Sequence, residues 1–488
     1  MALNTSPNTG DTAAASAPNA VRKIWQRGID IFEQSEDFFR PMEGRSQTSL
    51  IQSKVETSKG RGQEIEFTVM AGLYGEPKMG DELFNDGTDF EKINLDSDSL
   101  AVDYLRHAVR YTERMEEKMG MRGEIAVGLP DELGKWLGRQ KTEKLLMMYL
   151  HRGTSDNTKY AGSNGGRDSI LKHNTFDHDE VVTLVPQLRR QGGQPAFVGR
   201  DMSGNAIHKY CIVATVDALF SLEMDPAYKQ QLAGSDERGP GNYIFKGGYR
   251  NIRGNIIRDY NPIDHDGWGP IGSPLNPRAE LGVAITAANT AQDIKGGGTA
   301  TAAAMTAVFY MKWFPKYDYR FLPGDALDTS GDSNFYVAIV NPDDGTATAN
   351  KFGFYEISAN DGHKLTMTKR LRASTTGTAY AQIGSVVWDS AVNTDAHPVG
   401  STIVLCNSKG VQIGSTLMLA QRSARRGYGK WTNRRTEQIH EAGFVRDIFI
   451  TSVFGQEPRL DARGRAVGYK VLEHALQTAG MPLNPTLA

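Results

Sequence analysis

The pattern of apolar and polar positions changes several times along the 488 residues of the chain. Residues 97–120 repeat apolar side chains at spacings of three and four, which predicts a helix of about six turns. Opposite charges one turn apart support this helix, and Gly120 ends it. Residues 64–69 instead alternate apolar and polar side chains, and the glycines of "SKGRG" before them indicate a reversal of the chain. We therefore predict a β-hairpin over residues 51–70.

Composition separates the remaining segments. Residues 2–20 are small and polar, which is typical of an arm that orders only against another surface. Residues 325–411 are rich in Thr, Ser, Asp, Asn and Gly and hold five or more short alternating runs, which indicates an all-β domain. From residue 411, "GVQIGSTLMLAQRSARRGYG" predicts an amphipathic helix. The predicted parts are an N-terminal arm (1–50), a hairpin with its lead-in (51–96), the long helix (97–124), a mixed core (125–324), the inserted all-β domain (325–411) and a C-terminal return to the core (412–488).

Charge and cysteine content narrow the class of protein. Lysine and arginine number 55 and aspartate and glutamate 57, so the net charge is −2 and no overall field attracts nucleic acid or a membrane. Cys211 and Cys406 lie far apart, which argues against a disulfide framework or a cysteine metal site. The most apolar stretch, residues 302–311, is too short to span a bilayer. We therefore predict no membrane partner.

Histidine and acidic residues cluster at two places without a catalytic spacing. His173 and His178 lie in "HNTFDHDE", and Asp264 lies in "NPIDHDGWGP". Neither cluster has the spacing of a zinc-binding helix, and the first runs into a predicted helix start, where acidic residues are favoured in any case. Neither a nucleophile elbow nor a phosphate-binding loop occurs. We predict no enzyme, no catalytic residue, no cofactor and no metal, and we keep a metal-dependent hydrolase as an alternative.

One run in the C-terminal part is strongly basic and has aromatic residues between its charges. Arginine neutralises phosphate and aromatic rings stack on bases, so the run suits non-specific contact with DNA. Salt bridges between subunits or a solvated loop also explain it, and we favour these. A non-specific DNA-binding protein is the second alternative. The basic residues are Arg422, Arg425, Arg426, Lys430, Arg434 and Arg435.

Three segments resemble the phage-N4-type major capsid proteins of tailed bacteriophages. They are "GEPKMGDELFNDGTDFEKINLDSDSLAVDYLRHAVRYTERM", "NYIFKGGYRNIRGNIIRDYNP", and "LMLAQRSARRGYG" followed by "HEAGFVRDIFITSVFGQEPRL". The resemblance covers residues 45–290 and 411–488, and it lies in the order and spacing of elements. It implies the HK97-like capsid fold, an α+β architecture with an N-terminal arm, an E-loop hairpin, a peripheral domain with a long spine helix, and an axial domain. The β-rich domain would be an insertion into this fold.

The same resemblance implies the function. The protein would be the major capsid protein of a tailed double-stranded DNA bacteriophage, assembled in the host cytoplasm and retained in the virion. Copies would join as pentamers and hexamers into the icosahedral head that encloses the genome. Some shells of this fold are cross-linked through a lysine, but no specific acceptor is visible in this sequence, so non-covalent assembly is the default expectation. A separate scaffolding protein and a portal protein are expected partners, and a decoration protein is a further candidate. The near-zero net charge favours only weak, non-specific contact with the packaged DNA.

Contacts between subunits are the remaining prediction. Aromatic residues of the arm and the apolar face of the hairpin should dock on neighbouring subunits, and charged residues beside the spine helix should make polar contacts. The predicted contact residues are Trp25, Phe32, Phe38, Phe39, Ile65, Phe67, Val69, Asp103, Arg106, Arg110 and Arg114.

Overall fold

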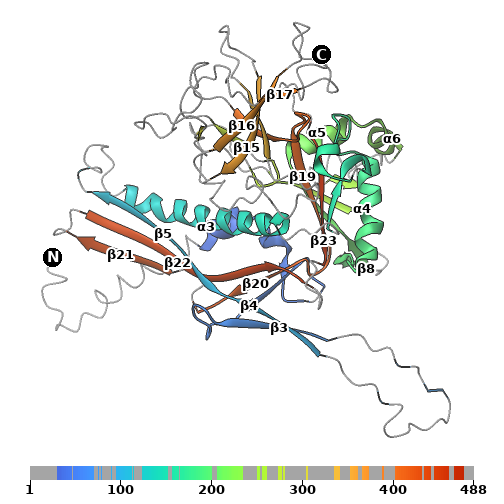
Figure 1. The fold of residues 1–488 in the computed structure, drawn as a ribbon. Coiled ribbons are helices and arrows are strands. Elements are labelled where there is room, and N and C mark those ends of the chain that lie inside the picture. The colour runs from blue at the N-terminus through green and yellow to red at the C-terminus, as the bar shows by residue number, and fades with distance from the viewer. Residues whose placement is uncertain are drawn as a thin grey trace, which may run out of the picture. The chain divides into compact units, whose positions relative to one another are not determined.

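A computed structural model of the chain combines helices and strands, and the predicted α+β class is confirmed (Figure 1). The residues that it describes are 30–46, 48–70, 95–112, 124–151, 157–163, 165–200, 206–234, 250–252, 255–260, 273–276, 278–280, 304–305, 335–340, 352–360, 365–372, 387–389, 402–430, 434–440, 445–460 and 467–476, with Gly75, Lys78, Met79, Phe90 and Arg114. The chain divides into two compact units. Unit 1 comprises Met1–Gln47, Ile51–Thr142 and Ala424–Glu457, and unit 2 comprises Thr48–Leu50, Glu143–Ser423 and Pro458–Ala488.

Unit 1 is built around one sheet, made in the described residues by β1 (Glu43–Gly44), β2 (Ile51–Val55), β20 (Ala424–Tyr428), β22 (Val445–Pro458), β21 (Arg434–His440) and β5 (Asp103–Thr112). The long strand β22 pairs antiparallel with both β21 and β5. β2 pairs in parallel with β1 and with β20. A short 3₁₀ turn, η1 (Arg40–Met42), precedes β1.

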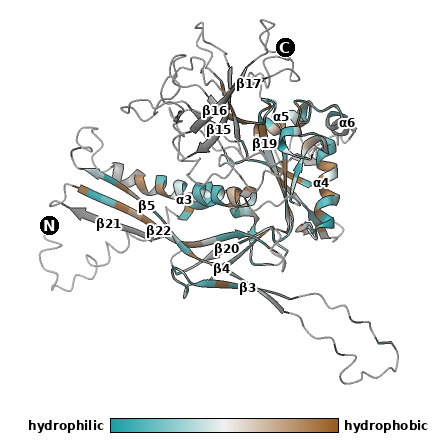
Figure 2. Ribbon diagram, in the orientation of Figure 1, coloured by the Kyte–Doolittle hydropathy of each residue, from teal (hydrophilic) through white to brown (hydrophobic). Residues whose placement is uncertain are grey.

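A long helix packs against this sheet. α3 (Glu124–His151) runs along β5 and β22 and carries hydrophobic residues among its polar ones (Figures 1 and 2). The two elements share a buried cluster because leucines on one side of the helix meet apolar residues of the strands. Its members are Leu133 and Leu137 of the helix and Tyr111, Ile448 and Ile450 of the strands.

The helix predicted over residues 97–120 is wrong. β4 (Leu95–Ala101) and β5 occupy its described part, and the long helix of unit 1 is α3. Along β5, Leu105 and Val109 are partly buried, whereas Arg106 and Arg110 are exposed, so the side chains alternate with a period of two. A spacing of four fits this period as well as it fits a helix. Ten residue pairs with β22 decide the outcome, and the local pattern could not show them.

Both strands of the hairpin predicted over residues 51–70 are present, as β2 and β3 (Glu64–Met70), but they do not pair with each other. β3 pairs antiparallel with β4, and together they form a two-stranded ribbon that projects from the sheet (Figure 1). The glycine turn before β3 does not fold β3 back onto β2. Instead, Gly62 N–H donates a hydrogen bond to Val102 O, so a segment distant in sequence fixes the turn.

Unit 2 contains a second sheet, whose described strands in spatial order are β10 (Arg250–Ile252), β11 (Asn255–Asp259), β9 (Cys211–Ala214), β19 (Ile413–Leu419), β23 (Tyr469–Ala475) and β6 (Thr158–Tyr160). Its largest apolar cluster combines residues of the sheet with Leu184 of α4 (His178–Arg190), Leu222 of α5 (Val216–Met224) and Tyr228 of α6 (Pro226–Gly234). The core of unit 2 therefore lies between these helices and the sheet. The shorter elements are η2 (Ala161–Ser163), η3 (Arg167–Ser169), and β7 (Ala196–Arg200) paired with β8 (Ala206–Lys209).

The amphipathic helix predicted from residue 411 is also wrong, because this segment forms β19 and β20. Every residue of both strands is buried. A strand that is covered on both faces shows no alternation, and periodicity then cannot distinguish it from a helix. The two strands are separated by a turn in which Arg422 has a φ of 52°.

A third sheet, also in unit 2, contains the short strands predicted between residues 325 and 411. Its described strands are β12 (Arg278–Glu280), β18 (Thr402–Cys406), β14 (Phe335–Val340), β15 (Phe352–Asn360), β16 (Leu365–Arg372), β13 (Ala304–Met305) and β17 (Val387–Asp389). β12 and β13 come from before residue 325, so the sheet recruits strands from outside the predicted insertion. The boundaries of an inserted domain stay a prediction. Across the described residues, no helix has the length and apolar character needed to cross a membrane.

Candidate functional site

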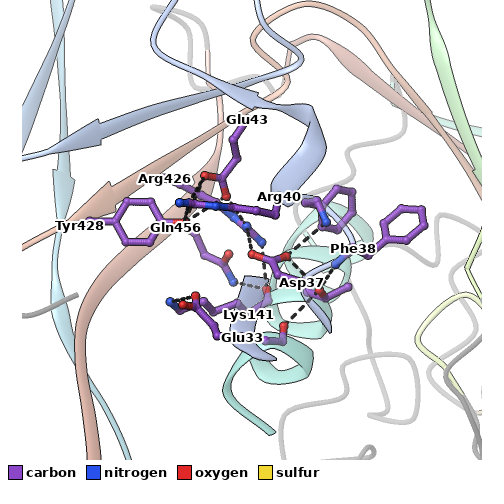
Figure 3. Close-up of polar contacts among 12 residues, drawn as sticks. Glu33, Asp37, Phe38, Arg40, Glu43, Lys141, Arg426, Tyr428 and Gln456 are labelled. Atoms are coloured by element: carbon purple, nitrogen blue, oxygen red, sulfur yellow. Dashed lines mark hydrogen bonds and ion pairs between the residues drawn. The ribbon is translucent and has the colours of Figure 1, made fainter. Parts of the chain in front are cut away.

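A cluster of buried charges fixes residues 30–44 to the rest of unit 1 (Figure 3). Arg426 of β20 is 0% exposed, and its Nη1 donates to Asp37 Oδ2 and to Glu43 Oε1, each at 2.5 Å. Lys141 of α3 is enclosed in the same way and donates to Glu33. The N-terminal segment thus supplies the carboxylates, and elements far away in the sequence supply two of the cations.

Hydrogen bonds between neutral and charged groups complete the cluster. The Tyr428 hydroxyl donates to Glu43 Oε1 at 3.1 Å, and Arg40 Nη1 donates to Glu43 Oε2 at 2.8 Å and to the Tyr428 oxygen at 3.0 Å. Thr142 Oγ1 donates to Asp37 Oδ1 at 3.1 Å. The ion pairs join three carboxylates to three cations, so the cluster carries no net charge.

Burial and charge act in opposite directions on the buried groups. Burial by itself lowers the pKa of Arg426, but Asp37 and Glu43 outweigh this effect and hold that pKa well above its ordinary value. Burial raises the pKa of Tyr428, which keeps its hydroxyl protonated as a donor. Because these groups are enclosed and satisfy one another, they hold the N-terminal segment in place rather than react with a substrate.

The aromatic residues predicted as arm anchors lie in three different environments. Phe39 is 0% exposed, and the Arg426 guanidinium lies 5.7 Å from its ring centroid, so its contact is internal and not with a neighbour. Phe32 and Phe38 are partly buried, and Lys135 Nζ lies 5.7 Å from the Phe32 ring. Trp25 lies outside the described residues.

The apolar face of the ribbon is buried within its own subunit. Ile65 and Phe67 pack with Leu100, Val102 and Val453, which corrects the prediction that these two residues anchor a neighbour. The ribbon lies close to the backbone of the sheet because glycines of the sheet face it. A Cβ on Gly455 would lie 2.4 Å from the Ala101 carbonyl oxygen, so only glycine fits at this crossing. Val69 lies in β3, and its side chain is outside the described part.

A polar groove lies beside the root of the ribbon. It has a volume of about 430 Å³ and is lined by residues of β2 and β3 and by Arg45. Lys54 Nζ donates to Glu66 O at 2.8 Å across it. On this side of β3, a backbone carbonyl therefore accepts its hydrogen bond from a flexible lysine side chain rather than from a neighbouring strand.

The four charged residues predicted beside the spine lie on or after β5 instead. Arg110 forms a bidentate pair with Asp447, at 2.7 and 2.8 Å. Asp103 forms an exposed ion pair with Arg61 at 3.0 Å. Arg106 and Arg114 are exposed. All four side chains are largely exposed, and their role as contacts between subunits stays a prediction.

The basic run does not form a single surface. Arg425 and Arg426 are buried, and Arg425 pairs with Asp98 while lying 5.7 Å from the Phe67 ring centroid. Lys430 is exposed. Arg422 lies in the turn before β20, and Arg434 and Arg435 lie in β21, their side chains outside the described part. A strand directs successive side chains to opposite faces, so the run of charges in the sequence is distributed over several environments.

The candidate metal ligands are not brought together in the described part of the chain. His173 is exposed, and His178 begins α4, where its N–H donates to Asp225 Oδ2 at 2.8 Å. Asp177 caps this helix by accepting from Glu180 N–H at 2.8 Å, as expected for an acidic residue at a helix start. Among the described residues, no three histidine, cysteine or acidic side chains lie close enough to hold a metal ion. Asp264 lies outside them.

Comparison with known proteins gives the class. Residues 12–167 match the family model described as phage capsid protein. No curated protein is significantly similar to the chain. The capsid of Ralstonia phage GP4 has 14% identity and a TM-score of 0.49 over 91% of this chain and 92% of that chain. The cyanophage Pam1 capsid has 9% identity and a TM-score of 0.49 over 90% and 92%, and the Helicobacter pylori bacteriophage KHP30 capsid has 10% and 0.47 over 90% and 91%.

The family match confirms the predicted function at the level of a phage capsid protein, which is a structural component of the virion shell. The assignment rests on this match, since the TM-scores of the solved capsids lie below 0.5. The matched residues include the described part of the N-terminal segment, the ribbon and α3.

Sequence reasoning missed the acidic residues of the ionic cluster. Glu33, Asp37 and Glu43 stand among the aromatic residues of the segment and match no motif of a binding or catalytic site. The signal that could have identified them is the position of these acids in an otherwise apolar segment, "IFEQSEDFFRPMEG". Acids among residues destined for burial call for cationic partners elsewhere.

Proposed function

We propose that the chain is the shell-forming subunit of a tailed-phage head, in which copies join as pentamers and hexamers around double-stranded DNA. The observation that carries the proposal is the capsid-family match over residues 12–167. The three segments that resemble phage-N4-type major capsid proteins support assignment to that family in particular.

The ribbon suits contact with a neighbouring subunit. A two-stranded ribbon is only marginally stable alone, and here the described side chains at its root pack against the sheet. Within the described residues, β3 pairs with β4 on one edge and leaves the other edge beside the polar groove. An added segment from a second copy would supply the backbone hydrogen bonds that this edge lacks.

The ionic cluster gives the N-terminal segment a fixed point of departure. Residues 30–44 are held by enclosed ion pairs, so the position of Asp30 on the subunit is fixed. We propose that this preceding segment, with Trp25, docks on another copy. Its small, polar composition supports this proposal, because such a segment orders only against another surface.

Assembly then follows from repetition of modest contacts. Closed symmetry repeats each contact many times, so the shell is stable although one contact is weak. The partners that we propose are other copies of the chain, a scaffolding protein and a portal protein, with a decoration protein as a further candidate. Assembly would take place in the host cytoplasm, and DNA would be held without tight binding because the net charge is −2.

Electron microscopy and size-exclusion chromatography of the expressed protein test the proposal. Shells, tubes, or rings of five and six subunits are the expected result, with the candidate scaffold supplied where the chain alone stays small. A second protein in which a short turn replaces residues 71–94 should fold and fail to assemble. A matched control shortens residues 341–351, the connection between β14 and β15, and should still assemble. A monomer under every condition would refute the proposal.

A further inference from the structure

Arg422 carries a charge that the described part of the subunit leaves without a counter-ion. Its Nε and Nη1 are enclosed and donate to no acceptor. Among the described residues, no carboxylate forms an ion pair with it. Arginine donors enclosed in a native protein nearly always have acceptors, so this exception calls for a physical explanation.

A second arginine makes the position less favourable for a charged group. Burial lowers the pKa of Arg422, and the nearby charge of Arg459 lowers it further. The backbone keeps the two residues close, because Arg459 N–H donates to Ser423 O at 3.0 Å. Two neighbouring cations attract an anion more strongly than either would alone.

The surrounding chain holds Arg422 in a strained conformation. Its φ of 52° lies in the left-handed region, which side chains other than glycine seldom adopt. Arg422 N–H donates to Ser49 O at 2.8 Å, and Ser423 N–H donates to Leu50 O at 2.9 Å. The Tyr149 and Ser423 hydroxyls lie 2.9 Å apart. Strain that is fixed from several sides is typical of positions with a function beyond folding.

We propose that Arg422 and Arg459 form a binding site for a carboxylate, which an aspartate or glutamate side chain of a second copy of the chain supplies. Arginine presents a planar fork of donors that matches the two oxygens of a carboxylate. This inference rests on the proposed function, since it requires that copies of the chain assemble.

The enclosure of Arg422 favours a protein carboxylate over the phosphate of packaged DNA. Duplex DNA is a wide cylinder, and its phosphates reach mainly side chains that extend into solvent. Arg422 is only partly exposed, and two of its nitrogen atoms are covered. An acidic side chain is slim and stands away from its backbone, so it can approach the accessible edge of a recessed guanidinium.

Replacement of Arg422 tests the assembled state against the free subunit. In the Arg422→Gln protein, the free subunit should unfold at the same urea concentration as the wild type or a higher one, because the repulsion from Arg459 is removed. Assembled particles should dissociate at a lower urea concentration. A purely structural role would instead lower the midpoint of the free subunit, and that result would overturn the proposal. Arg106→Gln, an exposed arginine on β5, is the matched control and should change neither midpoint.

A small carboxylate tests the site even if no shell forms. Sodium acetate should raise the thermal midpoint of the free wild-type subunit relative to sodium chloride at equal ionic strength, and this difference should vanish in the Arg422→Gln variant. An equal response of both proteins would overturn the anion site, whereas failure to assemble would overturn the proposed function alone.

Two further results would assign the site to another ligand. Asp461 follows Arg459 by two residues. If Asp461→Asn lowers the urea midpoint of the free subunit, and this effect disappears when Arg422 is also replaced, the partner of Arg422 lies within the same chain. Duplex DNA binding that the Arg422→Gln variant loses would show that the ligand is a phosphate. Either result would overturn the second-copy carboxylate.

Discussion

Arg426 and Arg422 lie four residues apart in the sequence and have opposite surroundings. In unit 1, Arg426 is fully enclosed, and its Nη1 binds Asp37 and Glu43. In unit 2, Arg422 lies beside Arg459, and two of its nitrogen atoms are covered without an acceptor. The first arginine belongs to a neutral cluster, and the second belongs to a pair of like charges.

The difference shows what a buried charge reveals about function. A charge that is enclosed with its counter-ions stabilises the subunit that contains both. A charge that is half-enclosed without a counter-ion is unfavourable in the isolated subunit, and a partner that arrives later can remove this penalty. We infer that Arg426 acts in folding and that Arg422 acts in assembly.

Removal of the Arg426 charge should have the largest effect. Arg426→Met leaves Asp37 and Glu43 enclosed without their main cation, and the free energy of unfolding of the subunit should fall by about 5 kcal/mol. Urea unfolding of the free subunit measures this change. Arg106→Met, at an exposed position, should change stability by less than about 0.5 kcal/mol. Equal effects of the two substitutions would contradict the role of Arg426.

The Lys141–Glu33 pair sharpens the comparison, because both partners can be replaced. Lys141→Met alone should cost about 3 kcal/mol, since it leaves the buried Glu33 carboxylate without the lysine that it pairs with. Adding Glu33→Gln should recover part of that loss, because no charge then remains at this pair. A double-mutant cycle in urea measures the coupling. If the double variant loses more stability than the sum of the losses of the two single variants, the ion pair is not the source of the effect.

Tyr428 gives the cluster a dependence on high pH. Its hydroxyl donates to Glu43, and Tyr428→Phe should cost about 2 kcal/mol at pH 7. Burial raises the pKa of Tyr428 above its usual value of 10.0, so the folded subunit retains this proton while the unfolded chain releases it. The stability that Tyr428 contributes is therefore complete below pH 10 and is lost as the pH rises further.

Unfolding of wild type and Tyr428→Phe between pH 7 and pH 11 measures this dependence. The difference in stability between them should narrow above about pH 10. A difference that widens with pH would show that the Tyr428 pKa is lowered by Arg426 and Arg40 more than burial raises it.

The pattern of apolar and polar residues predicts secondary structure correctly where local periodicity alone determines the element. The short alternating runs predicted between residues 325 and 411 are the strands β14 to β18. The pattern failed for β5 and β19, where pairing partners are distant. β5 pairs with β22 over ten positions, and β19 is covered by neighbours on both sides. Strand pairing between residues more than 300 positions apart leaves no local mark in a single sequence.

The same limit applied to the candidate site. The basic residues were found by composition, but composition could not distinguish Arg426 from Arg422. That distinction depends on which residues fold against them, since Glu33 and Asp37 reach the cluster from the N-terminal segment. A charged residue in a basic, polar stretch of the sequence can therefore lie in the core of the folded subunit.

The backbone at Arg422 gives the smallest and most specific prediction. At a φ of 52°, any residue with a Cβ is strained, whereas glycine is not. Arg422→Ala removes the repulsion from Arg459 and keeps the strain, and Arg422→Gly removes both. The glycine variant of the free subunit should therefore be more stable than the alanine variant by about 1 kcal/mol, measured by urea unfolding. Elsewhere, glycine in place of alanine lowers stability, so the reversed order identifies the strained turn. If alanine is the more stable, Arg422 is not strained, and its position is explained by packing within the subunit rather than by a partner in the shell.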